Sequence, residues 1–352
     1  MSAEDPGFNK AEMILQSQSS SIALLIGNGI NLACGQKRSI SWNDLLGELI
    51  ERSSRSASKN TFTNNLKLLL ERDSRDLTPA SLPEAFDIIK ATCMMSADNL
   101  PKDRFQEIIA GLLRKMEPDA PHKRLIVWAQ QSNVPVLTTN YDHCFQYALD
   151  GKCKRKRFGL LKPMSQYYPW DRYYASKAII EPMHEFAIWH IHGDCEIRQS
   201  IRAGLDQYMG MVERLRAIKG TVAVESLNTQ KDISESVPAF HKAPWLKIFM
   251  GKKLWIQGLA LQPDEVAIRW LLIERFRYWS KYLPDSCRES GWYIHGPTDI
   301  TGKIDRNRKI FLESVGIKVL EIKRPLNDYV NLYSIGINAS NQFSKDSQRA
   351  CT

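Results

Sequence analysis

SIALLIGNGIN, the sequence of residues 21–31, is an apolar run that ends in two glycines separated by one residue. A short aliphatic run closed by a turn is typical of a strand buried inside a sheet. Gly27 and Gly29 allow the main chain to turn tightly and to approach a bound phosphate closely. The G-x-G-x-x-G pattern is incomplete, because position 32 is Leu32 and the next glycine is Gly35. A plain tight turn therefore stays open as an interpretation.

Five more apolar runs follow, and segments with helical periodicity separate them. They are VPVLTTNYD at 134–142, FAIWHIHGD at 186–194, KKLWIQGL at 252–259, GWYIHG at 291–296 and GIKVLEIK at 316–323. Strands that alternate with helices predict a parallel sheet with helices on both faces. The expected fold class is therefore α/β, with a Rossmann-like sheet and a helical insertion or lid.

The folded domain is predicted to span residues 21–325. Residues 1–20 are polar and rich in serine, which is typical of a flexible lead-in. Helical periodicity predicts insertions at about 44–130 and 205–248, and for the polar second segment an insertion and a lid both stay open. Residues 326–352 are expected to form a polar tail.

The chain has 352 residues and a formal net charge of +9. Its densest basic run is KCKRKR at 152–157, which we interpret as a solvated loop, with an anion-binding rim as the alternative. No basic stripe is interleaved with aromatic residues, and no zinc-finger spacing occurs. The sequence therefore predicts no dedicated nucleic-acid binding.

The seven cysteines stand singly, and none forms a C-x-x-C pair. This scatter argues against a disulfide framework and against a cysteine-rich zinc site, so no metal is expected. No apolar stretch approaches the roughly 20 residues of a membrane-spanning helix, and the N-terminus lacks a secretory core. These features favour a cytoplasmic protein without a membrane partner.

Polar residues follow two further predicted strands at the point where each strand ends. Asn140 and Asp142 follow one, and His192 follows the other. Because the carboxyl ends of parallel strands meet at one edge of a sheet, we expect these residues to lie near Gly27. Two alternatives stay open: Asn140 and Asp142 as helix caps, and His190 with His192 as packed strand histidines or as two metal ligands. Alternation along a strand would point the two histidines to the same face.

These residues resemble the motifs of the sirtuin-like superfamily, in order, from about residue 21 to residue 322. GNGIN at 27–31 is similar to the G-A-G-[IV]-S turn, TNYD at 139–142 to T-[QN]-N-[IY]-D, and HG at 192–193 to the catalytic H-G. GLAL at 258–261, followed by Asp264, resembles the segment that lies against the nucleotide. SWNDLL at 41–46 resembles the S-W-x-x-L-L element of the bacterial branch.

The chain departs from the protein-deacetylating sirtuins in several ways. It lacks their two zinc-binding C-x-x-C pairs, and Asn28, Asn31 and Ala260 replace Ala, Ser and Ser of the pattern. The zinc-free, helix-rich form resembles the NAD-consuming effectors of prokaryotic antiviral defence. That resemblance implies an NAD⁺ hydrolase that depletes NAD in abortive infection, a co-encoded regulatory or sensor partner and a homo-oligomer.

The resemblance also implies site residues. NAD would be the substrate, Asn140 would hold a ribose hydroxyl and a water, and His192, with an ordinary pKa near 6.5, would accept a proton. The residues expected to bind NAD are Gly27, Asn28, Gly29, Asn31, Asp44, Thr139, Asp142, Gly193, Gly258, Leu259 and Asp264. Two alternatives stay open: a module that binds NAD or ADP-ribose without catalysis, and an NAD-dependent protein deacylase.

Overall fold

The computed structural model of the chain describes residues 6–33, 40–54, 81–95, 104–159, 166–220, 243–282, 290–296 and 304–322. The expected polar tail at 326–352 and part of each predicted insertion lie outside these residues. None of the described helices is long and apolar enough to cross a membrane.

Eight strands form one sheet in the order β3-β4-β5-β2-β1-β6-β7-β8. Their bounds are β1 Ile22–Ile26, β2 Val136–Thr138, β3 Lys154–Arg157, β4 Arg172–Ala175, β5 Ile188–His190, β6 Lys253–Gln257, β7 Gly291–His295 and β8 Ile317–Glu321. The six strands from β5 to β8 in this order are parallel to one another, whereas β3 and β4 form an antiparallel edge. The predicted strands at all six apolar runs are confirmed.

The six parallel strands follow the doubly wound order of a Rossmann-like sheet. Counted along the chain, β5-β2-β1-β6-β7-β8 corresponds to the order 3-2-1-4-5-6. The direction of winding reverses between β1 and β6, which pair from Ile22↔Lys253 to Ile26↔Gln257. Ligands of such folds bind at the carboxyl ends of the strands beside this reversal.

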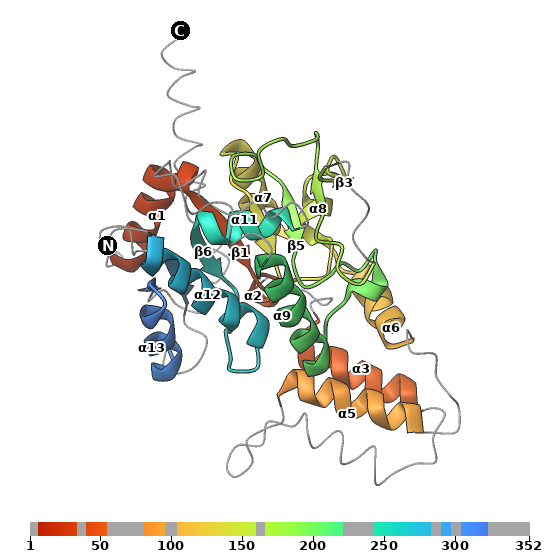
Figure 1. Cartoon of the computed structure of the whole chain (residues 1–352). Coiled ribbons are helices and arrows are strands. Elements are labelled where there is room, and N and C mark those ends of the chain that lie inside the picture. Colours follow the sequence, from red (N-terminus) through yellow and green to blue (C-terminus); the bar gives the residue numbers. More distant parts are fainter. Residues whose placement is uncertain are drawn as a thin grey trace, which may run out of the picture.

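Helices cover both faces of the sheet, as the sequence predicts (Figure 1). Their bounds are α1 Pro6–Gln18, α2 Gly29–Ala33, α3 Trp42–Ser54, α5 Leu82–Met95, α6 Arg104–Leu113, α7 Ala120–Gln131, α8 Cys144–Ala148, α9 Leu205–Gly220, α11 Pro244–Gly251, α12 Val266–Tyr282 and α13 Arg306–Ser314. Two short 3₁₀ turns, η1 Ser19–Ser21 and η2 Arg198–Ser200, join them.

The sheet separates two apolar cores, because side chains alternate along each strand. In β1, Ala23 and Leu25 pack with residues of α9, α11 and α12. Ile22, Leu24 and Ile26 pack with residues of α1, α7 and α8 on the other face. All five β1 residues are fully buried, which accounts for their continuous apolar sequence.

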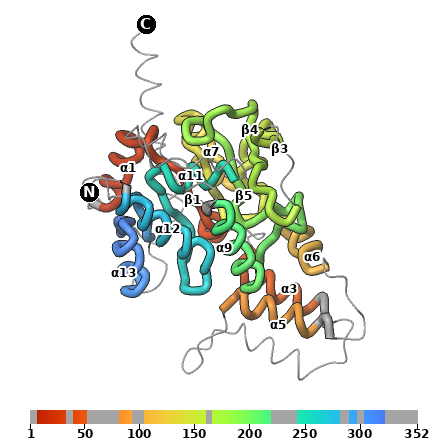
Figure 2. Tube along the Cα trace, in the orientation of Figure 1, coloured from red at the N-terminus to blue at the C-terminus, as the bar shows by residue number. Residues whose placement is uncertain are grey.

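A third core joins α3, α5 and α6 into a helical lobe. Its buried residues include Leu46, Phe86 and Ile109, one from each helix. The same core contains Tyr141 and Cys195, which follow β2 and β5. In Figures 1 and 2, α3 and α5 lie side by side at the lower edge of the molecule. The lobe therefore covers part of the edge at which those strands end.

The N-terminal segment differs from the flexible lead-in that its sequence predicts. Pro6–Gln18 form the helix α1, and its Phe8, Ala11, Ile14 and Leu15 are buried against the sheet. The apolar positions recur at helical spacing within a polar sequence, and this spacing buries one face of the helix. Residues 6–18 are therefore part of the core.

We expect Leu15→Ala to lower the free energy of unfolding by about 2–5 kcal/mol, because Leu15 is only 2% exposed and its loss leaves a cavity. Urea unfolding measures this change. Met13→Ala is the matched control on the exposed face of the same helix, where 62% of Met13 is accessible. Equal midpoints for the two variants would contradict the packing of α1.

The sequence predicted a solvated loop for the basic run at 152–157, but most of this run forms a strand. Lys154–Arg157 form β3, the edge strand paired with β4 from Lys154↔Ala175 to Arg157↔Arg172. Arg157 also contacts Asp171 at 2.9 Å. Exposed basic residues are common on edge strands, where their charge opposes pairing with another chain.

The second predicted insertion is largely part of the sheet's cover, not a lid. One core contains buried residues of α9, α11 and α12. They include Tyr208, Met211 and Leu215 of α9 and Trp245 and Phe249 of α11. Its residues 221–242 lie outside the described part of the chain. The first predicted insertion has two parts: α7 packs on the sheet, whereas α3, α5 and α6 form the helical lobe.

Candidate functional site

The turn after β1 meets the turn after β6 where the winding of the sheet reverses. The main-chain nitrogen of Gly29 donates to the carbonyl of Gly258 at 2.8 Å. A β-carbon on Gly27 would lie 2.5 Å from that carbonyl oxygen and 2.6 Å from Leu259, so only glycine fits at Gly27. Gly258 itself has a φ of 70°, which favours glycine. The predicted residues of these two turns are thus brought together.

The turn after β2 lies against the turn after β1. The Thr139 nitrogen donates to the carbonyl of Ile26 at 3.1 Å. The side-chain amide of Asn140 donates to the carbonyl of Gly27 over a longer 3.4 Å. Asn140 is buried, and among the described residues its side chain makes no other hydrogen bond. Its amide oxygen is therefore available to a ligand.

Asp142 serves partly as the helix cap that the sequence left open. One carboxylate oxygen accepts from the nitrogen of Cys144, the first residue of α8, at 3.0 Å. The other accepts from the side-chain nitrogen of Asn31 at 2.9 Å. Asn31 also donates to the side-chain oxygen of Asn28 at 2.7 Å. Asn28, Asn31 and Asp142 therefore form one network that joins the first two turns.

The two histidines of the third strand end do not share a face. β5 ends at His190, so the alternation predicted for His190 and His192 does not extend to His192. His190 donates from Nδ1 to the carbonyl of Asn140 at 2.7 Å, and Gln146 donates to its Nε2 at 2.6 Å. Burial lowers the pKa of His190, so it is neutral and fully engaged. The hydrogen bond from His190 to the Asn140 carbonyl holds the turn that contains Asn140.

His192 is buried but keeps an unpaired ring nitrogen. Among the described residues, its Nε2 has no hydrogen-bond partner. Its ring lies 5.2 Å from the ring of Tyr208, centroid to centroid. Burial lowers the pKa of His192 to about 3, so the imidazole is neutral at pH 7 and does not titrate near 6.5 as the sequence suggested. Within the described part of the chain, buried atoms of Gln106, Trp189 and Trp245 also lack a partner, so it is the position of His192 after β5, at the carboxyl end of the strands, that favours a ligand here.

Gly193 gives the chain the conformation that follows His192. Its φ is 123°, and a β-carbon there would lie 2.2 Å from the carbonyl oxygen of Ser200. The glycine of the H-G pair is therefore required by geometry, since no other residue fits beside Ser200.

Two predicted NAD-binding residues have other contacts. Asp44 is exposed and closes a capping box at the start of α3, where its carboxylate accepts from the Ser41 hydroxyl at 2.6 Å and from the Ser41 nitrogen at 2.9 Å. Asp264 accepts from the main chain of Leu82 at the start of α5, and burial raises its pKa. Neither side chain is shown beside Asn140 or His192, so both assignments stay predictions.

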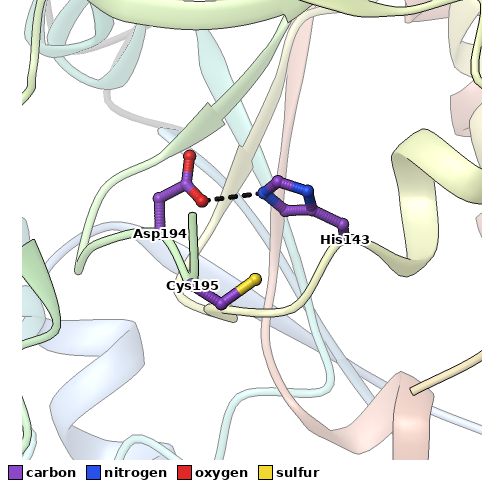
Figure 3. A group of neighbouring side chains, drawn as sticks. All are labelled: His143, Asp194 and Cys195. Atoms are coloured by element: carbon purple, nitrogen blue, oxygen red, sulfur yellow. Dashed lines mark hydrogen bonds and ion pairs between the residues drawn. The ribbon is translucent and has the colours of Figure 1, made fainter. Parts of the chain in front are cut away.

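A group of residues beside the site was not predicted as functional. His143 donates from Nε2 to one oxygen of Asp194 at 2.7 Å (Figure 3). The Tyr174 hydroxyl donates to the other oxygen at 2.5 Å. Burial alone would raise the pKa of Asp194, but the hydrogen bonds from His143 and Tyr174 bring it well below its ordinary value. Asp194 therefore carries a buried, fully paired charge.

His143, Asp194 and Cys195 also form the one group among the described residues whose donor atoms are close enough to suggest a metal site. Their donor atoms lie within 4.8 Å of one another. Two ligands of a tetrahedral zinc ion stay about 3.3 Å apart, given bonds of roughly 2.0–2.1 Å. The 2.7 Å between His143 and Asp194 is shorter and is that of a hydrogen bond. Burial also raises the pKa of the Cys195 thiol. The arrangement therefore fits a hydrogen-bonded pair better than a metal centre.

Three buried histidines lead us to expect that acid destabilises the protein. Burial lowers the pKa of His122, His190 and His192, so the unfolded chain binds protons first as the pH falls below about 6.5. The stability that their neutral forms contribute is present above pH 6.5 and is lost as the pH falls through the lowered pKa of each, which is about 3 for His192. Each such group changes the free energy of unfolding by about 1.4 kcal/mol per pH unit within its window. Urea unfolding at pH 7.5 and pH 5 measures the effect, and equal stabilities would contradict it.

A comparison with protein families finds a match to one part of the chain. Residues 134–233 match the family described as "SIR2-like domain". The matched segment contains Asn140, Asp142, His192 and Gly193, but not the turns after β1 and β6. No curated protein matches the chain. This part of the chain is therefore similar to SIR2-like domains, and the strand order of the sheet is that of a Rossmann-like fold.

Proposed function

We propose that the protein is an NAD⁺ glycohydrolase that cleaves the bond between nicotinamide and ribose. One observation carries the proposal: the Nε2 of His192 is buried without a partner, beside the edge where the three turns meet. A ligand hydroxyl or a water at this edge would supply the missing hydrogen bond. The paired glycine turns at the reversal of the sheet support a dinucleotide as that ligand.

The reaction requires little acid catalysis. Water attacks C1′ of the ribose, the C1′–N bond breaks, and its electron pair neutralises the pyridinium nitrogen of nicotinamide. ADP-ribose and one proton are the other products. Because the leaving group departs neutral, the site has to stabilise an oxocarbenium-like ribose and to position the water.

The proposed roles follow from the free atoms of each side chain. The amide oxygen of Asn140 would hold the water or a ribose hydroxyl, since its amide nitrogen is engaged with Gly27. The neutral His192 would accept a hydrogen bond from the same group and hold it in position. Asp142, whose carboxylate uses two of about four acceptor positions, would orient the ribose or the nicotinamide.

We further propose that this activity depletes NAD in anti-phage defence when a co-encoded partner activates it in the cytoplasm. The packing of the helical lobe on Tyr141 and Cys195 supports such control, since a partner that moves α3, α5 or α6 would change access to the edge. A homo-oligomer is part of the proposal by family resemblance alone.

The deciding experiment is to measure nicotinamide release from NAD⁺ by the purified chain, alone and with each co-encoded neighbour. Release that His192→Ala abolishes would support the hydrolase, and release only with a neighbour would identify the activator. Tight NAD⁺ binding without release under any condition would favour the non-catalytic module. Release that depends on an acyl-peptide would favour the deacylase.

A further inference from the structure

His122 lies in the first turn of α7, 18 residues before Asn140 in the sequence, and is only 2% exposed. Its Nδ1 accepts a hydrogen bond from the main-chain nitrogen of Asp119 at 3.1 Å, as part of the capping box of α7. A neutral imidazole that accepts at Nδ1 carries its proton on Nε2. The main chain therefore fixes the tautomer of His122.

The proton on Nε2 fixes the next side chain in turn. Nε2 donates to the side-chain oxygen of Asn31 at 2.7 Å. The amide of Asn31 cannot turn over, because its nitrogen would then face the Nε2–H group of His122. Its nitrogen must point toward Asn28 at 2.7 Å and Asp142 at 2.9 Å, as observed. One imidazole thus sets the direction of both hydrogen bonds.

Asp142 is held from two directions. Asn31 donates to one carboxylate oxygen, and the nitrogen of Cys144 donates to the other. A carboxylate with both oxygens engaged cannot rotate, and Asp142 is separated from Asn140 by a single residue. The position of the Asn140 turn therefore depends on a chain of contacts that begins at His122.

We propose that His122 is a positioning residue that sets the orientation of Asp142 and of the Asn140 turn through Asn31. The inference rests on the proposed function, since that orientation matters for hydrolysis of NAD⁺. Burying this polar chain carries a desolvation cost that an apolar side chain between α7 and α2 would avoid. Because this chain of hydrogen bonds runs from His122 toward the carboxyl edge of the sheet, we assign it a role beyond packing.

The test compares two variants. In His122→Leu the side chain stays apolar and of similar size, but it cannot donate to Asn31. In His122→Gln the oxygen can accept from Asp119, as glutamine does in a capping box, and the nitrogen can donate to Asn31. We expect kcat for nicotinamide release to fall about 10–100-fold in His122→Leu, with a smaller change in KM, and to recover largely in His122→Gln. His184→Leu, at an exposed histidine, is the control.

Two further measurements distinguish the possible outcomes. Urea midpoints of the variants separate positioning from unfolding, and ¹⁵N chemical shifts of the labelled histidines report the tautomer of His122 without any activity. Full kcat in a folded His122→Leu, or a proton on Nδ1 in the wild-type protein, would overturn the inference. A wild-type protein that releases no nicotinamide, alone or with any co-encoded neighbour, would instead overturn the proposed function, and the tautomer would still test the hydrogen-bond chain.

Discussion

Replacing His192 by alanine is expected to lower kcat for nicotinamide release by about 10²-fold or more, as for other groups that hold a reacting atom in position. The imidazole is the buried group at this edge whose ring nitrogen is left for a ligand. KM should change far less, because the acceptor acts mainly on charge that develops in the transition state. Initial rates of nicotinamide release across NAD⁺ concentrations measure both constants.

The fold should survive the loss of His192. Its Nε2 makes no hydrogen bond to lose among the described residues, and what the variant removes is packing against Tyr208. The urea midpoint checks this point directly. His184→Ala, at an exposed position, should leave both constants unchanged. Wild-type turnover in a folded His192→Ala protein would remove the residue from the mechanism.

The sheet could be predicted from the sequence because its parallel strands are buried on both faces. Such strands read as continuous apolar runs, and β1, with five fully buried residues, is the clearest of them. β3 could not be recognised in this way. Its four residues are all basic, and its pairing with β4 depends on a partner that begins 15 residues after β3 ends. An edge strand takes its structure from its neighbour and not from its own pattern.

The helix α1 shows a second limit. Its buried residues follow helical spacing, but polar residues and serines outnumber them in residues 1–20. Composition then suggested a flexible segment, whereas the spacing of Ala11, Ile14 and Leu15 was the informative signal. Asp44 shows that one pattern can have two interpretations. The pattern Ser41-x-x-Asp44 is also a capping box, and this local interaction is the one observed.

The residues of the site also fall into two groups: those placed by their own strand, and those placed by contacts between distant parts of the sequence. The Asn140 and His192 turns could be predicted, because each follows its own strand directly. The partners that hold those turns could not. His122 lies 91 residues from Asn31, and His143 lies 51 residues from Asp194. No periodicity or motif connects residues at such separations, so only the fold reveals that they touch.

Replacing Asn140 by alanine is the second change for which we expect a large effect, a loss of about 10²-fold or more in kcat, as for other groups that orient a reacting atom. The amide carries two duties at once. Its nitrogen holds the carbonyl of Gly27, and its oxygen stays available for the water or a ribose hydroxyl. Alanine removes both, while the main-chain contact from Asn140 to His190 remains. Nicotinamide release measures the loss.

Stability separates these two duties of Asn140. The 3.4 Å bond to Gly27 is long, so its loss should cost no more than about 1 kcal/mol of unfolding free energy. Asn140→Asp keeps the shape but places a carboxylate against the Gly27 carbonyl, where no hydrogen bond can form. This variant should therefore lose more stability than Asn140→Ala, although it keeps an oxygen for the water. Asn9→Ala on the exposed face of α1 is the control for both. If Asn140→Ala retained full turnover, the amide oxygen would not position the attacking water, and that role would pass to Asp142.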